Sequence, residues 1–438
     1  MVRSVFHSHS SPYSFILPTP PPSKGLEIIA PHVESLCSLL RNRVYVPKAP
    51  SIFDHKVEEY LKNLSDPVLH HIETHGATET LLGGDAPPYL RCLASLAFNL
   101  SQFFPGACQD FAVDEYQQSV ALHPQKGLPR TRIRSAKRHQ IAVVTKCTQT
   151  IISQMRSDSI ERIVDMGAGH SHLSANFGEK LGLPILAIDR DSDLLRTSKK
   201  LYSDIPNLSW HQACIGTPRE DVQIGTNDML VGLHACGSLG DQLIEKAVQS
   251  GVSAVFLVSC CLQKLRPALP FRYPLSDVVV QDKQLLKLLK TERRLLGVTN
   301  RSRNASQTST QGRVTRYALR KLLGDHGLHF KHGDEVHGLS RHAFKHGLKY
   351  VSEKIAEIHQ INLRLSEEEA GERMEAAAVD YRAVRALSVP RAVAGEILEM
   401  AIVLDRAARL EEQFHTVRTM RVWPESVSVR NQAIAAWN

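Results

Sequence analysis

No apolar run in the 438-residue sequence approaches the roughly 20 residues that a membrane-spanning helix needs, so we expect no membrane partner. The eight cysteines lack the spaced framework of a secreted disulfide-rich domain, and two of them, Cys260 and Cys261, are adjacent. This usage favours a reducing, intracellular compartment, cytoplasmic or nuclear. Acidic residues are absent before Glu27, and the only Lys or Arg residues there are Arg3 and Lys24. With a cluster of prolines nearby, this composition predicts a disordered leader over residues 1–25 rather than a targeting peptide.

The chain is long enough for two or three domains, and 42% of its residues are hydrophobic. The formal net charge is +8, which makes anionic partners such as RNA plausible, although a solvated basic surface explains so modest an excess equally well. The composition leaves the oligomeric state open. Helical signals dominate residues 26–134, which we interpret as a helical N-terminal region.

A strand–helix alternation begins after residue 160 and predicts an α/β fold. Apolar runs of strand length cover residues 162–166, 185–189, 229–234 and 254–260, with a weaker run at 208–213. Helix-forming segments separate them, so we expect a mostly parallel sheet covered on both faces. Two further strand-like runs, 416–423 and 432–437, predict a terminal hairpin that completes a seven-stranded sheet. We assign residues 135–438 to this domain, with a helical insertion at about 300–412.

The most specific motif is the turn after the first strand, Asp165-x-Gly167-x-Gly169. Glycines allow a tight turn there and a close approach of the backbone to a ligand. The second strand ends in Asp189, whose carboxylate can accept both hydroxyls of a ribose. A dinucleotide site would read similarly, but His172 occupies the position of the third glycine of that fingerprint. An ordinary strand–turn–helix is the other alternative.

An acid two places before the first glycine, with no third glycine, resembles S-adenosylmethionine (SAM) methyltransferases. That resemblance implies SAM as the cofactor, with Asp189 at its ribose and Asp165 orienting the loop near its amino-acid end. The cofactor-binding residues that it implies are Asp165, Met166, Gly167, Ala168, Gly169, Asp189 and His234.

Several segments, taken in order, are similar to the methyltransferase-like protein 25 family. They are Ser135–Gln140, His234-Ala235-Cys236-Gly237, Ser259-Cys260-Cys261, Tyr273-Pro274-Leu275-Ser276, Leu404-Asp405-Arg406 and Ser428-Val429-Arg430-Asn431. The Leu-His-x-Cys-Gly and Cys-Cys elements also resemble a tRNA 2′-O-methyltransferase family. The resemblance implies a class I, Rossmann-like methyltransferase. Departures from the family are Ser238 in place of an aspartate, Leu262-Gln263 after the double cysteine, and no acid at Ala213-Cys214 after the third strand.

His234 and Cys236 follow the fourth strand, from which such folds address the acceptor, and we expect both at the reacting centre. His234 can act as a general base or as a hydrogen-bond donor, or it can simply tie a loop through its ring nitrogens. His234, Cys236, Cys260 and Cys261 together would suit zinc. Because adjacent cysteines rarely chelate one ion without strain, we expect no metal and interpret the thiols as packing or site-lining groups.

Five cations precede or begin an amphipathic helix: Arg130, Arg132, Arg134, Lys137 and Arg138. They can contact phosphates or form a solvated face. We therefore expect a SAM-dependent methyltransferase that acts on a macromolecule, RNA (rRNA or tRNA) in preference to protein. The alternative is a non-catalytic SAM-binding or scaffold protein with the same fold.

Overall fold

The computed structural model describes residues 19–41, 52–106, 133–156, 159–215, 222–264, 274–298, 307–328, 334–340 and 342–438. These residues divide into two compact units. The first contains Met1–Arg41, Leu96–Asn300 and Ala394–Asn438, and the second contains Asn42–Ser95 and Arg301–Val393. Among the described residues, none of the helices has the length and apolarity needed to cross a membrane.

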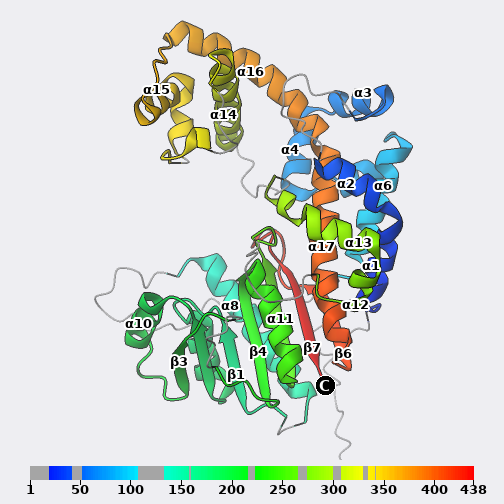
Figure 1. Cartoon of the computed structure of the whole chain (residues 1–438), viewed down its shortest axis with the longest axis vertical. Coiled ribbons are helices and arrows are strands. Elements are labelled where there is room, and N and C mark those ends of the chain that lie inside the picture. Colours follow the sequence, from blue (N-terminus) through cyan, green and yellow to red (C-terminus); the bar gives the residue numbers. More distant parts are fainter. Residues whose placement is uncertain are drawn as a thin grey trace, which may run out of the picture. The chain divides into compact units, whose positions relative to one another are not determined.

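The first unit is built on the seven-stranded, mostly parallel sheet that the sequence predicts, and its strand order is β3-β2-β1-β4-β5-β7-β6 (Figure 1). The strands are β1 (Arg162–Met166), β2 (Ile185–Asp189), β3 (Leu208–Gln212), β4 (Asp228–Cys236), β5 (Ala254–Cys260), β6 (Thr416–Arg421) and β7 (Gln432–Trp437). The first five pair in parallel, and β7 runs antiparallel to β5 and β6. The strand order therefore reverses between β1 and β4, which places a ligand site at the carboxyl ends of the central strands.

Helices cover both faces of this sheet because its central strands are apolar on both sides; every residue of β5 is buried. On one face, α8 (Ser135–Gln154) and α9 (His172–Leu181) share a core with Met229, Val231 and Leu233 of β4. On the other face lies α11 (Ser238–Ser250), whose Leu243 approaches Gly232 so closely that an added Cβ would lie 2.8 Å from its Cδ1. The remaining crossover helix is α10 (Ser192–Leu201).

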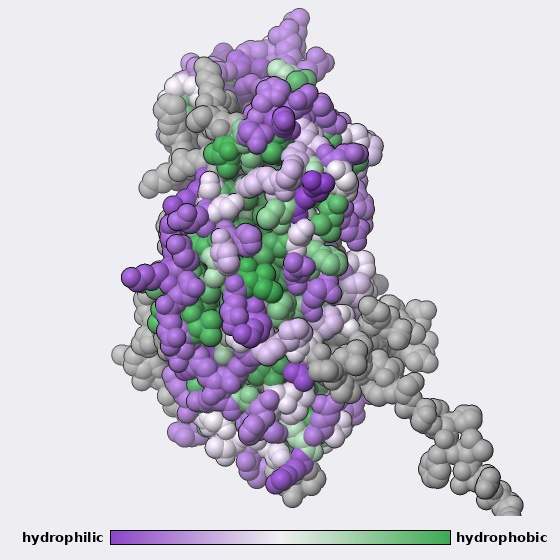
Figure 2. Space-filling view, turned by 90° about the vertical axis from the view of Figure 1, so that its right-hand side faces the viewer, coloured by the Kyte–Doolittle hydropathy of each residue, from purple (hydrophilic) through white to green (hydrophobic). Residues whose placement is uncertain are grey.

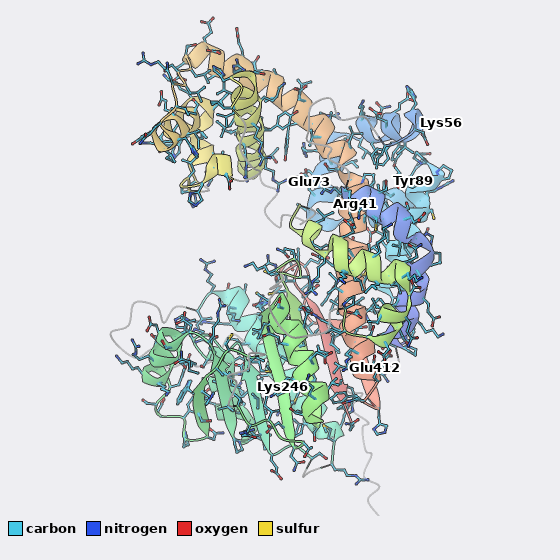
Figure 3. The ribbon with its side chains drawn as sticks, in the orientation of Figure 1. Arg41, Lys56, Glu73, Tyr89, Lys246 and Glu412 are labelled. Atoms are coloured by element: carbon cyan, nitrogen blue, oxygen red, sulfur yellow. The ribbon has the colours of Figure 1, made fainter. Side chains whose placement is uncertain are left out.

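Further helices of the first unit lie beside the sheet's antiparallel end (Figure 1). They are α1 (Pro22–Ile29), η2 (Ala30–His32), α2 (Val33–Arg41), α12 (Asp277–Gln281), α13 (Lys283–Lys287), η3 (Leu288–Glu292), η4 (Arg293–Val298) and the later part of α17 (Val389–Glu411). Arg41, labelled in Figure 3, forms an ion pair with Glu292. Figure 2 shows apolar residues among hydrophilic ones on one face of the molecule. The helix α6 (Pro88–Ser101) carries Phe98, which is 48% exposed.

The leader predicted for residues 1–25 is too long at its carboxyl end. Pro22 begins α1, and Gly25 and Leu26 are buried. Proline favours the first turn of a helix because its fixed φ fits and its missing N–H would have no partner there, so the prolines mark a helix start. Residues 1–18 lie outside the described part of the chain.

The second unit is helical. It is formed by two segments, Asn42–Ser95 and Arg301–Val393, which are far apart in the sequence. It contains α3 (His55–Asn63), α4 (Asp66–His75), α5 (Thr78–Leu82), α14 (Gln307–Asp325), η5 (Asp334–Val336), η6 (Ala343–His346), α15 (Gly347–His359), α16 (Glu367–Leu387) and the start of α6. Arg385 of α16 donates to Glu73 of α4 at 2.8 Å, and Arg382 donates to backbone carbonyls beside α3. The second unit thus takes part of the predicted N-terminal region, 26–134, and part of the predicted insertion, 300–412. Pairing between such distant segments leaves no local signal in the sequence.

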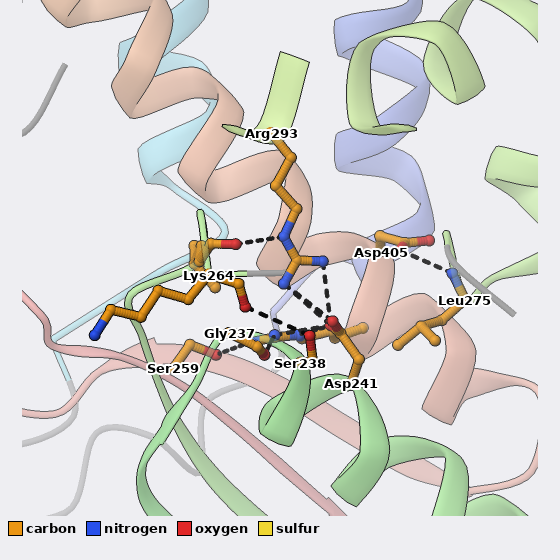
Figure 4. A network of polar contacts seen from close by, with 10 residues as sticks. Gly237, Ser238, Asp241, Ser259, Lys264, Leu275, Arg293 and Asp405 are labelled. Carbon is orange, nitrogen blue, oxygen red and sulfur yellow. Dashed lines mark hydrogen bonds and ion pairs between the residues drawn. The ribbon is translucent and has the colours of Figure 1, made fainter. Parts of the chain in front are cut away.

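A buried ionic network joins the sheet to the C-terminal helix (Figure 4). Arg406 of α17 donates to Asp241 Oδ1 at 2.9 and 2.8 Å, to Ser259 Oγ at 3.0 Å and to the Gly237 carbonyl at 2.8 Å. Arg293 forms a second ion pair with Asp241, at 3.0 Å. Burial would raise the pKa of Asp241, but the two guanidinium groups outweigh it and hold that pKa below its usual range. Four segments are thus fixed around one buried carboxylate.

The neighbouring residue, Asp405, ties a second loop to α17. Its carboxylate accepts from the Leu275 and Ser276 backbone N–H groups at 3.1 and 3.0 Å and from the Ser276 hydroxyl at 2.6 Å. Leu404-Asp405-Arg406 and Leu275-Ser276 stand out separately in the sequence, and the structure brings them together.

Replacing Asp241 with alanine should destabilise the first unit by about 3–5 kcal/mol, because two buried guanidinium groups would lose their carboxylate. A urea titration of the purified protein measures the change. Arg196→Ala is the control: its pair with Asp193 is exposed (67% and 79%), and it should change stability by less than about 1 kcal/mol. Equal effects from the two variants would contradict the role given to the network.

Candidate active site

The loop after β1 is held against β2 by backbone hydrogen bonds. The N–H groups of Gly167 and Ala168 donate to the Ile188 carbonyl at 2.9 and 3.0 Å. Gly167 and Gly169 have φ values of +81° and +56°, which residues with a Cβ adopt at a cost. The tight turn that the sequence predicts is therefore present, and α9 begins directly after it.

Asp189, at the end of β2, accepts one hydrogen bond from the loop after β1 and one from the start of its own loop. Oδ2 accepts from the Gly169 N–H at 2.8 Å and Oδ1 from the Asp191 N–H at 3.0 Å. Each oxygen keeps a lone pair for another donor. Asp189 lines the cavity described below, so its remaining acceptor capacity suits ribose hydroxyls.

Asp165 links the end of β1 to α9. It is buried and accepts from the Ser174 hydroxyl at 2.6 Å. Burial raises its pKa to about 6, against the opposing effects of Ser174 and Lys137. Asp165 does not line the cavity, and its position suits a role in orienting the loop.

A cavity of about 400 Å³ opens at the carboxyl ends of β1 to β4, a volume within the usual range for small-ligand sites. Of the predicted cofactor residues, Gly167, Asp189 and His234 line it, whereas Met166, Ala168 and Gly169 do not. Ala213, Cys214 and Ile215 contribute a largely apolar wall after β3, where the acid common in related folds is missing. The full lining is Gly167, Ile188, Asp189, Arg190, Ala213, Cys214, Ile215, His234, Cys236, Ser238, Leu239, Gln242 and Lys264.

His234 lies in a strained backbone conformation near the carboxyl end of β4. Its φ is +64°, and the register of β4 with β5 shifts between Leu233 and Ala235. Nε2 lies 2.9 Å from Gln140 Oε1, an oxygen that can only accept, so Nε2 carries the proton and Nδ1 keeps its lone pair. Burial, followed by the charges of Lys137 and Arg430, lowers the pKa of His234 to about 4, so the ring is neutral at pH 7.

The Nδ1 atom of His234 is buried and has no hydrogen-bond partner among the described residues. Leaving such an acceptor unpaired costs about 1–3 kcal/mol. A strained residue with an unpaired acceptor beside a cavity is the arrangement expected of a group that meets a ligand.

Helix α8 contributes residues that the sequence alone does not assign to the site. Gln140 contacts His234. Lys137, one of the five cations that could contact phosphates, is partly buried beside Asp165, Cys260 and Cys236. Burial lowers the pKa of Lys137, and these three groups oppose the shift. The spacing of Lys137 and Gln140, three residues apart on one helix face, is the signal that could have found them.

Cys236 and Cys260 end adjacent strands and are register partners. Their Sγ atoms lie 2.7 Å apart. The hydrogen bond with Cys260 lowers the pKa of Cys236 to about 6, which outweighs the effect of burial. Cys260 is buried, whereas Cys236 is exposed and lines the cavity.

Comparison with known proteins agrees with this geometry. Residues 136–268 match a family model described as a methyltransferase domain. No curated protein matches the chain.

Similar solved structures include coclaurine N-methyltransferase bound to N-methylheliamine and SAH, 12% identical, with 93% of this chain and 98% of that chain covered and a TM-score of 0.26. The CurJ carbon methyltransferase is 10% identical, with 63% and 84% covered and a TM-score of 0.26. Human N-acetylserotonin methyltransferase in complex with SAM is 13% identical, with 51% and 59% covered and a TM-score of 0.20. Because these TM-scores are low, the methyltransferase fold is assigned from the family model and from the strand order. The chain contains a SAM-dependent methyltransferase domain with the class I, Rossmann-like fold.

Proposed function

We propose that the protein transfers the methyl group of SAM to a macromolecular acceptor, RNA (rRNA or tRNA) in preference to protein. The observation that carries this proposal is the position of α8. Its first turns bring Gln140 to the cavity residue His234 and Lys137 close to Cys236, and the same turns carry Arg138, with Arg134 just before them. A cationic segment on the helix that contacts a cavity residue is suited to an acceptor with a phosphate backbone. The similarity to the methyltransferase-like protein 25 family and to a tRNA-modifying family adds support.

The described residues fit SAM. Asp189 can accept from its ribose hydroxyls, the Gly167 turn allows close approach of the backbone, and Ala213–Ile215 offer an apolar wall for its base. Bound SAM supplies an electrophilic methyl group on a sulfonium. The protein's task is then alignment of the acceptor, which can lower the barrier by about 7–11 kcal/mol.

His234 is the group that we propose as general base. Gln140 accepts the Nε2 proton, which fixes the tautomer and leaves Nδ1 to take a proton from the acceptor. Because burial keeps the ring neutral, Nδ1 is ready to accept. Cys236, exposed at the same strand end, would contact the acceptor beside it. A positioned base contributes about 10²–10⁴-fold to the rate.

The cations at the start of α8 would bind phosphates of the acceptor. Arg134 is exposed, and Arg138 is half-buried with an Nε that lacks a hydrogen-bond partner among the described residues. Arg130 and Arg132 lie outside the described residues. A protein acceptor, or SAM binding without turnover in a scaffold, are the alternatives that the experiments below distinguish.

Asp189→Ala should weaken SAM binding by roughly 10–100-fold, because charge-assisted hydrogen bonds to the ribose are worth about 1.5–3 kcal/mol. Asp189→Asn, which keeps one acceptor oxygen, should fall between the wild type and the alanine variant. Isothermal titration calorimetry gives the affinities, and circular dichroism checks the fold. Asp193→Ala, an exposed acid of α10, is the control. Wild-type affinity in a folded Asp189→Ala protein would refute the ribose assignment.

His234→Ala should lower the single-turnover rate of methyl transfer by about 10²–10⁴-fold. Gln140→Leu should lower it less, because the tautomer is no longer fixed but the imidazole remains. The assay follows tritium from methyl-labelled SAM into RNA and protein extracts, with nuclease and protease used to identify the labelled polymer. An absence of any labelled polymer with the wild type would favour the scaffold alternative.

Changing Arg132, Arg134 and Arg138 to glutamine should flatten the salt dependence of RNA binding by about 0.7–0.9 in log–log slope for each phosphate that is no longer neutralised. SAM affinity should stay unchanged, because these residues do not belong to the glycine loop. Filter binding of a structured RNA over a salt series measures the slope. A triple glutamine variant at Lys345, Lys349 and Lys354, in the second unit, controls for the reduced charge. If RNA binding by the wild type and by the variant at Arg132, Arg134 and Arg138 has the same salt-dependence slope, the acceptor is more consistent with a protein.

A further inference from the structure

Three thiols gather at one corner of the cavity. The Sγ atoms of Cys236, Cys260 and Cys261 all lie within 4.8 Å of one another, the one such cluster of possible metal ligands among the described residues. Two come from the ends of adjacent parallel strands, in register, and the third from the residue after β5. Burial among apolar residues does not require three thiols in mutual contact, since each could pack alone.

The backbone at Cys261 explains how neighbouring residues can face the same point. Side chains of consecutive residues in a strand point to opposite faces, which is why adjacent cysteines seldom bind one ion. Cys261 has a φ of +46°, a left-handed conformation that costs a residue with a Cβ roughly 1–2 kcal/mol. This turn ends the alternation and directs the third thiol back toward the other two. The adjacent spacing in the sequence is therefore compatible with one shared ion.

The surrounding backbone holds the cluster in place. The Gly237 N–H donates to the Cys260 carbonyl at 3.0 Å, and the Lys264 N–H donates to the Cys261 carbonyl at 2.9 Å. Gly237 lies so close to this loop that an added Cβ would be 1.8 Å from the Lys264 carbonyl oxygen. Lys137 and Lys264 interact electrostatically with the thiols. Such cations would balance the single excess negative charge of three thiolates around a divalent ion.

We propose that Cys236, Cys260 and Cys261 form a trithiolate site for Zn²⁺, with the fourth coordination position open toward the cavity. Two thiolates on a tetrahedral zinc, at about 2.3 Å from the metal, are about 3.8 Å apart. Cys236 and Cys260 would therefore separate from 2.7 Å by a side-chain rotation of the exposed Cys236. All three sulfurs bind as thiolates, and the protons still on them at the time of binding go to solvent. Three protein ligands with one exchangeable position is the arrangement of a zinc site that binds a substrate or water.

The rival state of the same atoms is a disulfide between Cys236 and Cys260. Its formation would remove two electrons and two protons and would need an external small-molecule disulfide as oxidant. A disulfide would leave Cys261 without a role, whereas the zinc site uses all three thiols and gives a reason for the strained backbone. We therefore argue for zinc, and the disulfide is an outcome of the test.

The test is elemental analysis of the full chain, purified under reducing conditions and dialysed after exposure to zinc sulfate. We expect about one zinc per chain. Cys236→Ser and Cys261→Ser should each lower this to under about a tenth after the same dialysis, because a site of two cysteines no longer retains the ion. Cys92→Ser, which changes an exposed thiol of α6, should keep the wild-type content.

Cobalt substitution tests the site in the wild-type protein, so its result does not depend on whether the variants fold. Wild-type protein loaded with Co²⁺ should develop a thiolate-to-metal charge-transfer band and the visible bands of a tetrahedral site, and a mercurial thiol reagent should release the metal. Retention of stoichiometric zinc in Cys236→Ser and Cys261→Ser would overturn the proposal. So would a wild type that takes up no zinc, binds copper in its place, or yields a Cys236–Cys260 disulfide by peptide mass spectrometry under the same conditions.

Discussion

The site depends on one buried guanidinium, that of Arg406. It donates to the Gly237 carbonyl and to Ser259, residues next to Cys236 and Cys260, while Asp241 neutralises its charge. Gly240 is needed for this approach, since an added Cβ would lie 2.8 Å from the Arg406 guanidinium. A charge taken out of water must be fully paired, so helix α17 and the ends of β4 and β5 are constrained to one arrangement. The C-terminal part of the chain thereby sets the geometry of a site built mostly from its middle.

The electrostatics of the cavity follow from burial. His234 is held neutral with an unpaired Nδ1, Lys137 is only partly exposed beside Asp165, and Cys236 carries a lowered thiol pKa. Burial shifts His234 and Lys137 toward their neutral forms, and the contact with Cys260 shifts Cys236 toward its thiolate. Such shifts are concentrated where a chain performs chemistry, and these three groups lie near the carboxyl end of β4.

The sequence predicted the sheet because its signals are local: apolar strands, helices between them, and a glycine turn followed twenty residues later by Asp189. It could not predict that Asp165 turns inward to Ser174, since both inward and outward carboxylates fit the same motif. Gln140 escaped notice because a glutamine in a helix carries no pattern until its partner, His234, is placed beside it. The division into two units was missed because Asn42–Ser95 and Arg301–Val393 meet through contacts between remote segments.

The central claim is that the cavity at the ends of β1 to β4 takes SAM, and calorimetry of the wild-type chain with SAM and with NAD tests it most directly. The glycine turn with His172 in place of a third glycine, together with Asp189 at the strand end, predicts saturable binding of one SAM per chain and no measurable heat with NAD. Binding of NAD with no response to SAM would contradict the account and make the site one for a dinucleotide.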